Sequence, residues 1–198
     1  MREEPLSGRD SLQLIQSMIN KARNQFSENG HLYLVWGWVV LFCSIGQFVL
    51  FYFFRSPWHP LVWLATWVAL AYQLVYISRN RKKQKVKTYT GDIISYVWLV
   101  FAILMILIGF NIGYNQKGQG YQLLSPVIIC LYGMPTFLSG KILRFKPLVY
   151  GGLGCWILSV IAAFIPYAFQ MLLFGVAVII AWIIPGYLLR NRYKRELI

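Results

Sequence analysis

The residues that could carry acid–base or metal chemistry all lie outside the cores of the long apolar runs of this chain, and His31, His59 and Asp92 lie at the ends of runs. The six Asp and Glu residues and the two His residues are Glu3, Glu4, Asp10, Glu28, His31, His59, Asp92 and Glu196. Proton relays and cation-coupled carriers use ionisable side chains at membrane depth, where such groups are costly and therefore diagnostic of function. The sequence also shows no metal-ligand cluster, Gly-rich phosphate loop or zinc-protease motif. We therefore expect no catalytic residue, no cofactor and no metal, and we favour a lipid-modifying enzyme least.

Six apolar runs, each long enough to cross a bilayer, make up most of the 198 residues. A hydrocarbon core of about 30 Å requires about 20 apolar residues in a helix. The predicted spans are 31–54, 60–78, 92–113, 121–140, 147–165 and 168–189. Pro166 separates the last two runs, and we expect a tight hairpin there because proline lacks a backbone donor and ends a helix. The predicted fold class is therefore all-α, a polytopic membrane protein whose six transmembrane helices form one domain over 31–189.

The basic residues alternate along the chain and predict its topology. Of the 19 Lys and Arg residues, 17 lie in the N-terminal segment, in 79–87, in 141–146 and in the tail 190–198. The remaining two, Arg55 and Lys117, lie in the intervening connections. The positive-inside rule then places both termini and the basic tail in the cytoplasm, with the basic-poor connections outside.

The connection between the second and third spans is the most basic segment of the chain. It holds Arg79, Arg81, Lys82, Lys83, Lys85 and Lys87, and the whole chain carries a formal net charge of +13. Because the charges follow helix ends, they favour attraction to anionic headgroups of the inner leaflet, at about 1 kcal/mol per basic residue, over nucleic acid. We expect membrane lipids as partners and no nucleic acid, and a cytoplasmic protein is a further candidate partner.

The segment 1–30 that precedes the first span is predicted to contain a surface helix. Between residues 10 and 29, apolar side chains recur at helical spacing, at Leu12, Ile15, Met18, Ile19, Ala22 and Phe26. Such an amphipathic helix is expected on the inner membrane surface, with its apolar face toward acyl chains or the bundle. A docking element for a cytoplasmic partner is the alternative interpretation.

Polar side chains and a proline within the spans suggest one candidate cavity. Gln47, Asn111 and Gln170 fall in the outer third of their helices and could line a shallow vestibule, although hydrogen bonding between helices explains them more simply. Pro135, close to Gly133, must kink or interrupt the fourth span, and broken helices often line transporter cavities. A kinked packing helix is the favoured alternative.

Small residues and tryptophans carry two further packing signals. Gly151, Cys155, Ser159 and Ala163 repeat at every fourth position of the fifth span, and Gly109 and Gly113 form a GxxxG pattern in the third. Such faces let helix backbones approach closely, either within one chain, which we favour, or across a homodimer seam. The tryptophans predicted to form an aromatic belt near the interfaces are Trp36, Trp38, Trp58 and Trp182.

The run from Ser11 through Ile19 and the sequence Trp36-Gly37-Trp38 resemble small multi-span bacterial inner-membrane proteins that have no assigned activity. The resemblance covers the amphipathic segment and the first span, and it implies a multi-pass protein of the inner, cytoplasmic membrane without a known active site. We interpret the chain as a non-catalytic membrane component that scaffolds or modulates a partner. A small transporter or channel for a neutral, apolar or anionic solute is the alternative.

Overall fold

The computed structural model describes residues 12–13, 30–83, 89–115 and 121–196, and all regular elements in these ranges are helical. Six helices are long and apolar enough to cross a membrane, which confirms the all-α fold class and the number of spans. The surface helix predicted over 10–29 lies outside the described residues, apart from Leu12 and Gln13.

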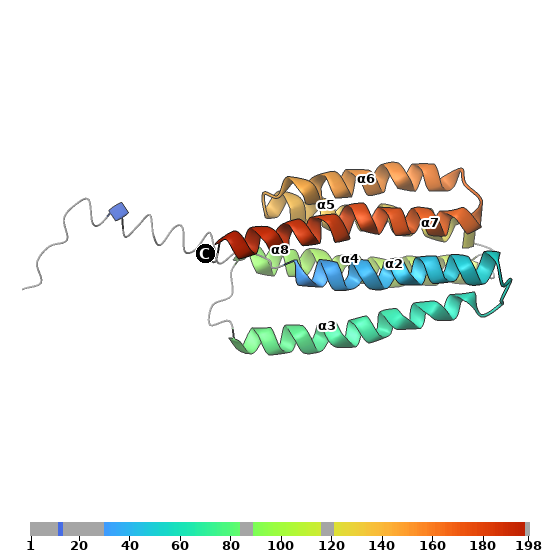
Figure 1. Ribbon diagram of the computed structural model, residues 1–198, viewed down its shortest axis with the longest axis horizontal. Helices are drawn as coiled ribbons and strands as arrows, with labels where there is room; N and C mark the ends of the chain where they lie inside the picture. Colours follow the sequence, from blue (N-terminus) through green and yellow to red (C-terminus); the bar gives the residue numbers. More distant parts are fainter. Residues whose placement is uncertain (1–11, 14–29, 84–88, 116–120, 197–198) are drawn as a thin grey trace, which may run out of the picture.

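The six spans are built from nine described elements. In chain order they are α2 (His31–Tyr52), η1 (His59–Trp63), α3 (Leu64–Lys83), α4 (Tyr89–Asn115), α5 (Tyr121–Ile142), α6 (Lys146–Ala163), α7 (Tyr167–Val178), η2 (Ile179–Ile183) and α8 (Ile184–Glu196). The element η1 is a short 3-10 helix that leads into α3, and η2 is a π-helical stretch. Because α7, η2 and α8 follow one another without a break, they form a single sixth span (Figure 1).

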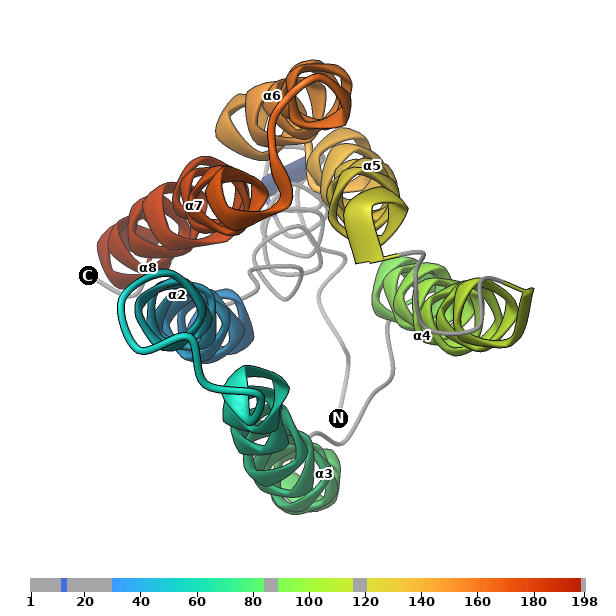
Figure 2. The ribbon, with the colours of Figure 1, turned by 90° about the vertical axis from the view of Figure 1, so that its right-hand side faces the viewer.

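Four of the spans form a packed core, and the other two lie at its periphery. The core consists of α2, α5, α6 and the sixth span, whereas α3 packs on α2 and α4 packs on α5 (Figure 2). In the apolar stretches of α3 and α4 only 6% of the residues are buried, against 44% in α5 and 56% in the sixth span. Among the described residues, α3 and α4 do not pack on each other to a comparable extent.

Glycines allow α5 and α6 to approach each other most closely. A Cβ atom on Gly140 of α5 would lie 2.6 Å from the backbone nitrogen of Val149. A Cβ atom on Gly152 of α6 would lie 2.8 Å from the backbone nitrogen of Phe137. Lipid provides no hydrophobic drive for helices to associate, so this close contact is itself a source of the packing energy.

The basic ends of the helices gather at one end of the bundle. The end of α3, the α5–α6 connection and the end of α8 all lie at the left of Figure 1, and the α2–η1 and α6–α7 connections lie at the right. We call the left end the basic end and the right end the opposite end. Arg55 is the one Lys or Arg at the opposite end whose position the structure describes.

Candidate functional site

The centre of the core contains a hydrogen-bonded pair that joins two irregular helices. Trp182 Nε1 in η2 donates to Thr136 Oγ1 in α5 over 3.0 Å. The Thr136 hydroxyl in turn donates to the carbonyl oxygen of Tyr132 over 2.7 Å. All three side chains are buried, and the Trp182 and Tyr132 rings lie 4.5 Å apart between centroids. The pair therefore ties the middle of the sixth span to α5.

The π-helical turn that carries Trp182 follows from the local sequence. The N–H of Ile184 bonds to the carbonyl of Ile179, five residues earlier, and Pro185 then cannot donate to the carbonyl of Ala181. Glycines on two neighbouring helices make room for the widened turn. A Cβ atom on Gly37 of α2 would lie 2.7 Å from Ile183 Cγ1, and one on Gly151 of α6 would lie 2.9 Å from Ala181 Cα. Such π turns recur at functional sites, which makes this region the first candidate.

Pro135 lies beside this pair, inside the continuous helix α5. It is fully buried, and it leaves the carbonyl of Leu131 without the usual helical donor. Side chains supply donors to nearby carbonyls, since Trp156 Nε1 of α6 donates to Cys130 O over 3.2 Å in addition to the Thr136 bond. Gly133 is needed here because a Cβ atom would collide with the indole of Trp156.

An aromatic cluster surrounds the Trp182–Thr136 pair. Its rings come from α2, α4, α5, α7 and η2, and the members are Tyr33, Trp98, Phe101, Tyr132, Phe174 and Trp182. The Trp98 ring of α4 lies 5.8 Å from Trp182 and 5.5 Å from Phe101 between centroids. This arrangement can pack aromatic rings and form hydrogen bonds, and its members include no carboxylate, amine or imidazole.

A second polar cluster lies near the opposite end, around the buried side chain of Gln47 on α2. Trp63 Nε1 donates to Gln47 Oε1 over 2.6 Å. Because an indole can only donate, this bond fixes the amide orientation, with the Gln47 NH2 group 3.1 Å from His59 Nδ1 and 3.3 Å from the Tyr167 hydroxyl. His59 Nδ1 therefore accepts a hydrogen bond, and the proton of the neutral ring lies on Nε2.

The three predicted vestibule residues have different hydrogen-bond partners in the structure. Gln47 bonds to η1 and α7, as described above. Gln170 of α7 donates to the carbonyl oxygens of Ala162 and Ile165 over 3.1 and 3.0 Å, and so stabilises the end of α6. Asn111 is exposed on α4 and donates to Leu107 O of its own helix over 2.9 Å. Each of the three amides therefore has its own set of hydrogen-bond partners.

The small residues of α6 contact two different neighbours. Gly151 faces η2, and Cys155 Sγ lies 3.9 Å from Ala177 O on α7. Ser159 Oγ donates to Pro126 O on α5 over 2.9 Å, whereas Ala163 is exposed.

The two small residues of α4 are placed differently from those of α6. Gly109 and Gly113 are exposed, and a Cβ atom on either would meet no described atom within 4 Å. Within the described part of the chain, this GxxxG pattern is therefore not used for packing.

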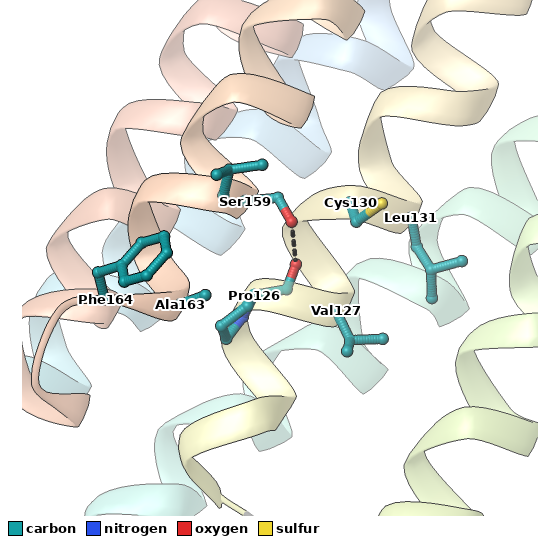
Figure 3. A pocket seen from close by; sticks show the side chains of 8 residues that line it. Pro126, Val127, Cys130, Leu131, Ser159, Ala163 and Phe164 are labelled. Atoms are coloured by element: carbon teal, nitrogen blue, oxygen red, sulfur yellow. Dashed lines mark hydrogen bonds between the residues drawn. The ribbon is translucent and has the colours of Figure 1, made fainter.

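An apolar groove of about 470 Å³ lies between α5 and α6 (Figure 3). Its walls are Pro126, Val127, Cys130, Leu131, Ser159, Val160, Ala163 and Phe164. Two polar atoms of the groove, Ser159 Oγ and Pro126 O, are hydrogen-bonded to each other, as the dashed line in Figure 3 shows. The groove is open to the outside and its other walls are apolar, so it provides mainly apolar contact.

The predicted headgroup-binding residues are only partly described. Arg79 is exposed near the end of α3, and Arg81, Lys82 and Lys83 belong to the last turn of that helix. Lys85 and Lys87 lie outside the described residues. For residues 81–83 the structure describes the helix but not the side chains.

The central pair is the feature that the sequence prediction missed. Trp182 was expected in the aromatic belt, but it is 2% exposed and belongs to the core, because Pro185 and the π turn direct this segment inward. The prolines Pro135 and Pro185 are the sequence signals that could have indicated the two irregular helices. Neither proline indicates that the two helices meet through Trp182 and Thr136. No family model, curated protein or solved structure matches this chain.

Proposed function

We propose that the protein is a non-catalytic component of the bacterial inner membrane that scaffolds or modulates a partner protein at its basic end. The observation that carries the proposal is a set of exposed cationic side chains at that end: Arg79, Lys141, Arg144, Lys146, Arg190, Arg192, Lys194 and Arg195. Asp92 is the one acidic residue whose side chain the structure describes, so positive charge dominates this surface. Acidic protein segments and anionic headgroups are the partners that such a surface suits.

The positive-inside rule supports a cytoplasmic location for the basic end and for both termini. There the basic residues meet the anionic lipids of the inner leaflet, with a gain of about 1 kcal/mol for each residue near the surface. The same charges would attract an acidic segment of a cytoplasmic or membrane partner. The lipid contact orients the bundle, and exposed cationic side chains of the same end would meet the partner.

The interior of the bundle supports a role without chemistry. Several buried polar side chains join different helices, as Trp182 with Thr136, Gln47 with Trp63, and Gln170 with the end of α6 illustrate. Bonds of this kind typically stabilise contacts between transmembrane helices. These bonds hold the helices of the bundle in a fixed arrangement, and we propose that the partner binds at the basic end of the bundle.

Site-specific photo-crosslinking in native membranes tests this proposal. A photoreactive amino acid at Lys146, exposed at the basic end, is expected to give a covalent adduct with an acidic segment of another protein, identified by mass spectrometry. The same label at Phe164, which is 85% exposed at the opposite end, is the matched control and is expected to give lipid adducts. Added salt should reduce the Lys146 adduct, because salt screens exposed charges. Lipid adducts alone at Lys146, or adducts of two copies of this chain, would contradict the proposed partner.

A second candidate function is a small transporter or channel for a neutral, apolar or anionic solute. The contact between the π turn and the Pro135 region favours it, because discontinuous helices meet at the substrate sites of many transporters. Flux of neutral and anionic solutes into proteoliposomes provides the test. Saturable flux that falls in Thr136→Val would support transport, and flux equal to that of protein-free liposomes would exclude it for those solutes.

A further inference from the structure

A hollow of about 610 Å³ lies at the opposite end of the bundle, beside the connection between α2 and η1. Its walls are Phe51, Tyr52, Arg55, Ser56, Pro57 and His59. The volume falls within the range of about 300–1,000 Å³ that is typical of small-molecule sites. The hollow lies far from the basic end, so an occupant here would be independent of the function proposed above.

The polar groups of the hollow are rich in hydrogen-bond donors. Arg55 has five N–H donors and no acceptor, and no described residue pairs with its guanidinium. His59 uses Nδ1 to accept from Gln47, which leaves Nε2–H as a donor. Ser56 Oγ accepts from the backbone N–H of Trp58 over 3.3 Å and keeps its own proton for donation. Three donor side chains without a carboxylate among the walls define a site for an anion.

The backbone holds Arg55 in an unusual conformation. Its φ angle is 45°, in the left-handed region that costs a residue with a side chain roughly 1–2 kcal/mol. The next residue, Ser56, bonds through its N–H to Leu50 O over 3.0 Å, and this bond fixes the turn. The backbone of Arg55 is therefore held in a fixed turn beside the hollow. Arg144 has nearly the same φ, 49°, at the basic end, and it provides a matched control for the conformation.

We propose that this hollow binds a phosphate anion, with the phosphodiester headgroup of a phospholipid as its occupant. Guanidinium groups bind phosphate oxygens in a bidentate manner, and His59 Nε2–H and the Ser56 hydroxyl add two further donors. The hollow lies at the end of a predicted span, where the headgroup region of a bilayer is expected, and it is larger than a phosphate ion requires. Phe51 and Tyr52 provide aromatic walls for the glycerol and upper acyl segments. A soluble phosphate ester shares the anionic chemistry and would lack these apolar contacts.

Histidine NMR of the full-length protein in nonionic detergent tests the proposal. The chain has two histidines, so imidazole labelling gives two signals, which His31→Gln assigns. Titration with a short-chain phosphatidylglycerol is expected to shift the His59 signal saturably. His31 lies at the basic end and reports lipid contact there separately. Arg55→Gln is expected to weaken the His59 titration by at least about tenfold, the loss expected for a hydrogen bond to a charged group, and Arg144→Gln by less than about twofold.

The other arms of the titration distinguish the source of the phosphate. A His59 shift with phosphatidylglycerol and none with inorganic phosphate supports a lipid headgroup, whereas saturable shifts with both support a general phosphate site. An unshifted His59 signal with both probes would overturn the proposal. Equal weakening by Arg55→Gln and Arg144→Gln would overturn it as well, since the effect would then follow from net charge. None of the His59 results tests a protein partner at the basic end, so the two proposals fail separately.

Discussion

The four core spans and the two peripheral helices are all apolar enough to cross a membrane, and they differ in how they are held. In the core, α5 and α6 approach closely at glycines, and the π turn of the sixth span fits between Gly37 and Gly151. In contrast, α3 is tied to α2 mainly by side-chain hydrogen bonds, including Trp36 Nε1 to Gln73 Oε1 at 2.6 Å. The helix α4 contacts the core through the rings of Trp98 and Phe101. Apolar composition brings a helix into the membrane, and small residues decide where it packs.

The largest predicted difference comes from placing the same side chain on a core glycine and on a peripheral glycine. Gly151→Leu would drive a side chain into Ala181 and the backbone of Ile180, both within 2.9 Å of the added Cβ atom. Overpacking of this kind should cost about 3 kcal/mol of unfolding free energy. Gly109→Leu meets open space and is expected to leave stability unchanged or slightly raised, because leucine favours helix more than glycine does.

Thermal unfolding of both glycine variants in the same detergent measures this difference. An equal loss in the two variants would mean that the Gly109 face is packed in the protein as it exists in solution. Size measurement of Gly109→Leu checks the alternative of a homodimer seam, which would show as a change from a dimeric to a monomeric mass.

A smaller effect is predicted for the central hydrogen bond. Thr136→Val keeps the side-chain volume, removes the acceptor of Trp182 Nε1 and leaves that buried donor unpaired. The expected cost is about 1–2 kcal/mol of unfolding free energy. Thr66→Val in α3 is the matched control, because the Thr66 hydroxyl donates only to Trp63 O nearby in the chain and is partly exposed. Equal losses of unfolding free energy in the two variants would contradict the proposed difference between the core and the periphery.

The smallest effect is predicted at the contact between α2 and α3. Gln73→Leu removes the acceptor of Trp36 Nε1 at a partly buried site. We expect a cost near the membrane average of about 0.6 kcal/mol, with the unfolding midpoint of the core almost unchanged. Disulfide trapping between cysteines placed on α2 and α3 would report the looser contact. A loss as large as that of Thr136→Val would show that α3 belongs to the cooperative core.

Much of the fold could be predicted because the membrane constrains it strongly. Helix length follows from bilayer thickness, and Pro166 marks the hairpin between α6 and α7. The positions of basic residues predicted a shared end for the loops near Lys83, Lys146 and Arg190, and the structure places these segments at one end of the bundle. These features depend on local composition and spacing, which a single sequence displays directly.

The contacts between helices were much harder to predict. Gly109 and Gly151 both belong to small-residue patterns, yet one is exposed and the other is buried. Trp182 looked interfacial, and the π turn that carries it inward depends on space provided by Gly37 and Gly151 on other helices. The hollow at Arg55 likewise depends on the turn geometry and on the orientation of Gln47. Such features arise from pairs of residues far apart in the chain, which helical periodicity does not reveal.

The central claim is that the core is fixed whereas α3 and α4 are only lightly held, and pulsed electron paramagnetic resonance tests it most directly. Nitroxide labels at Val68 and Ile106 report the separation of α3 and α4, and labels at Ile157 and Val176 report a core pair; all four positions are exposed. In nanodiscs of the purified Cys130→Ser protein, we predict a broad distance distribution for the first pair and a narrow one for the second, because helices with few buried contacts open most easily. Two equally narrow distributions would contradict the account.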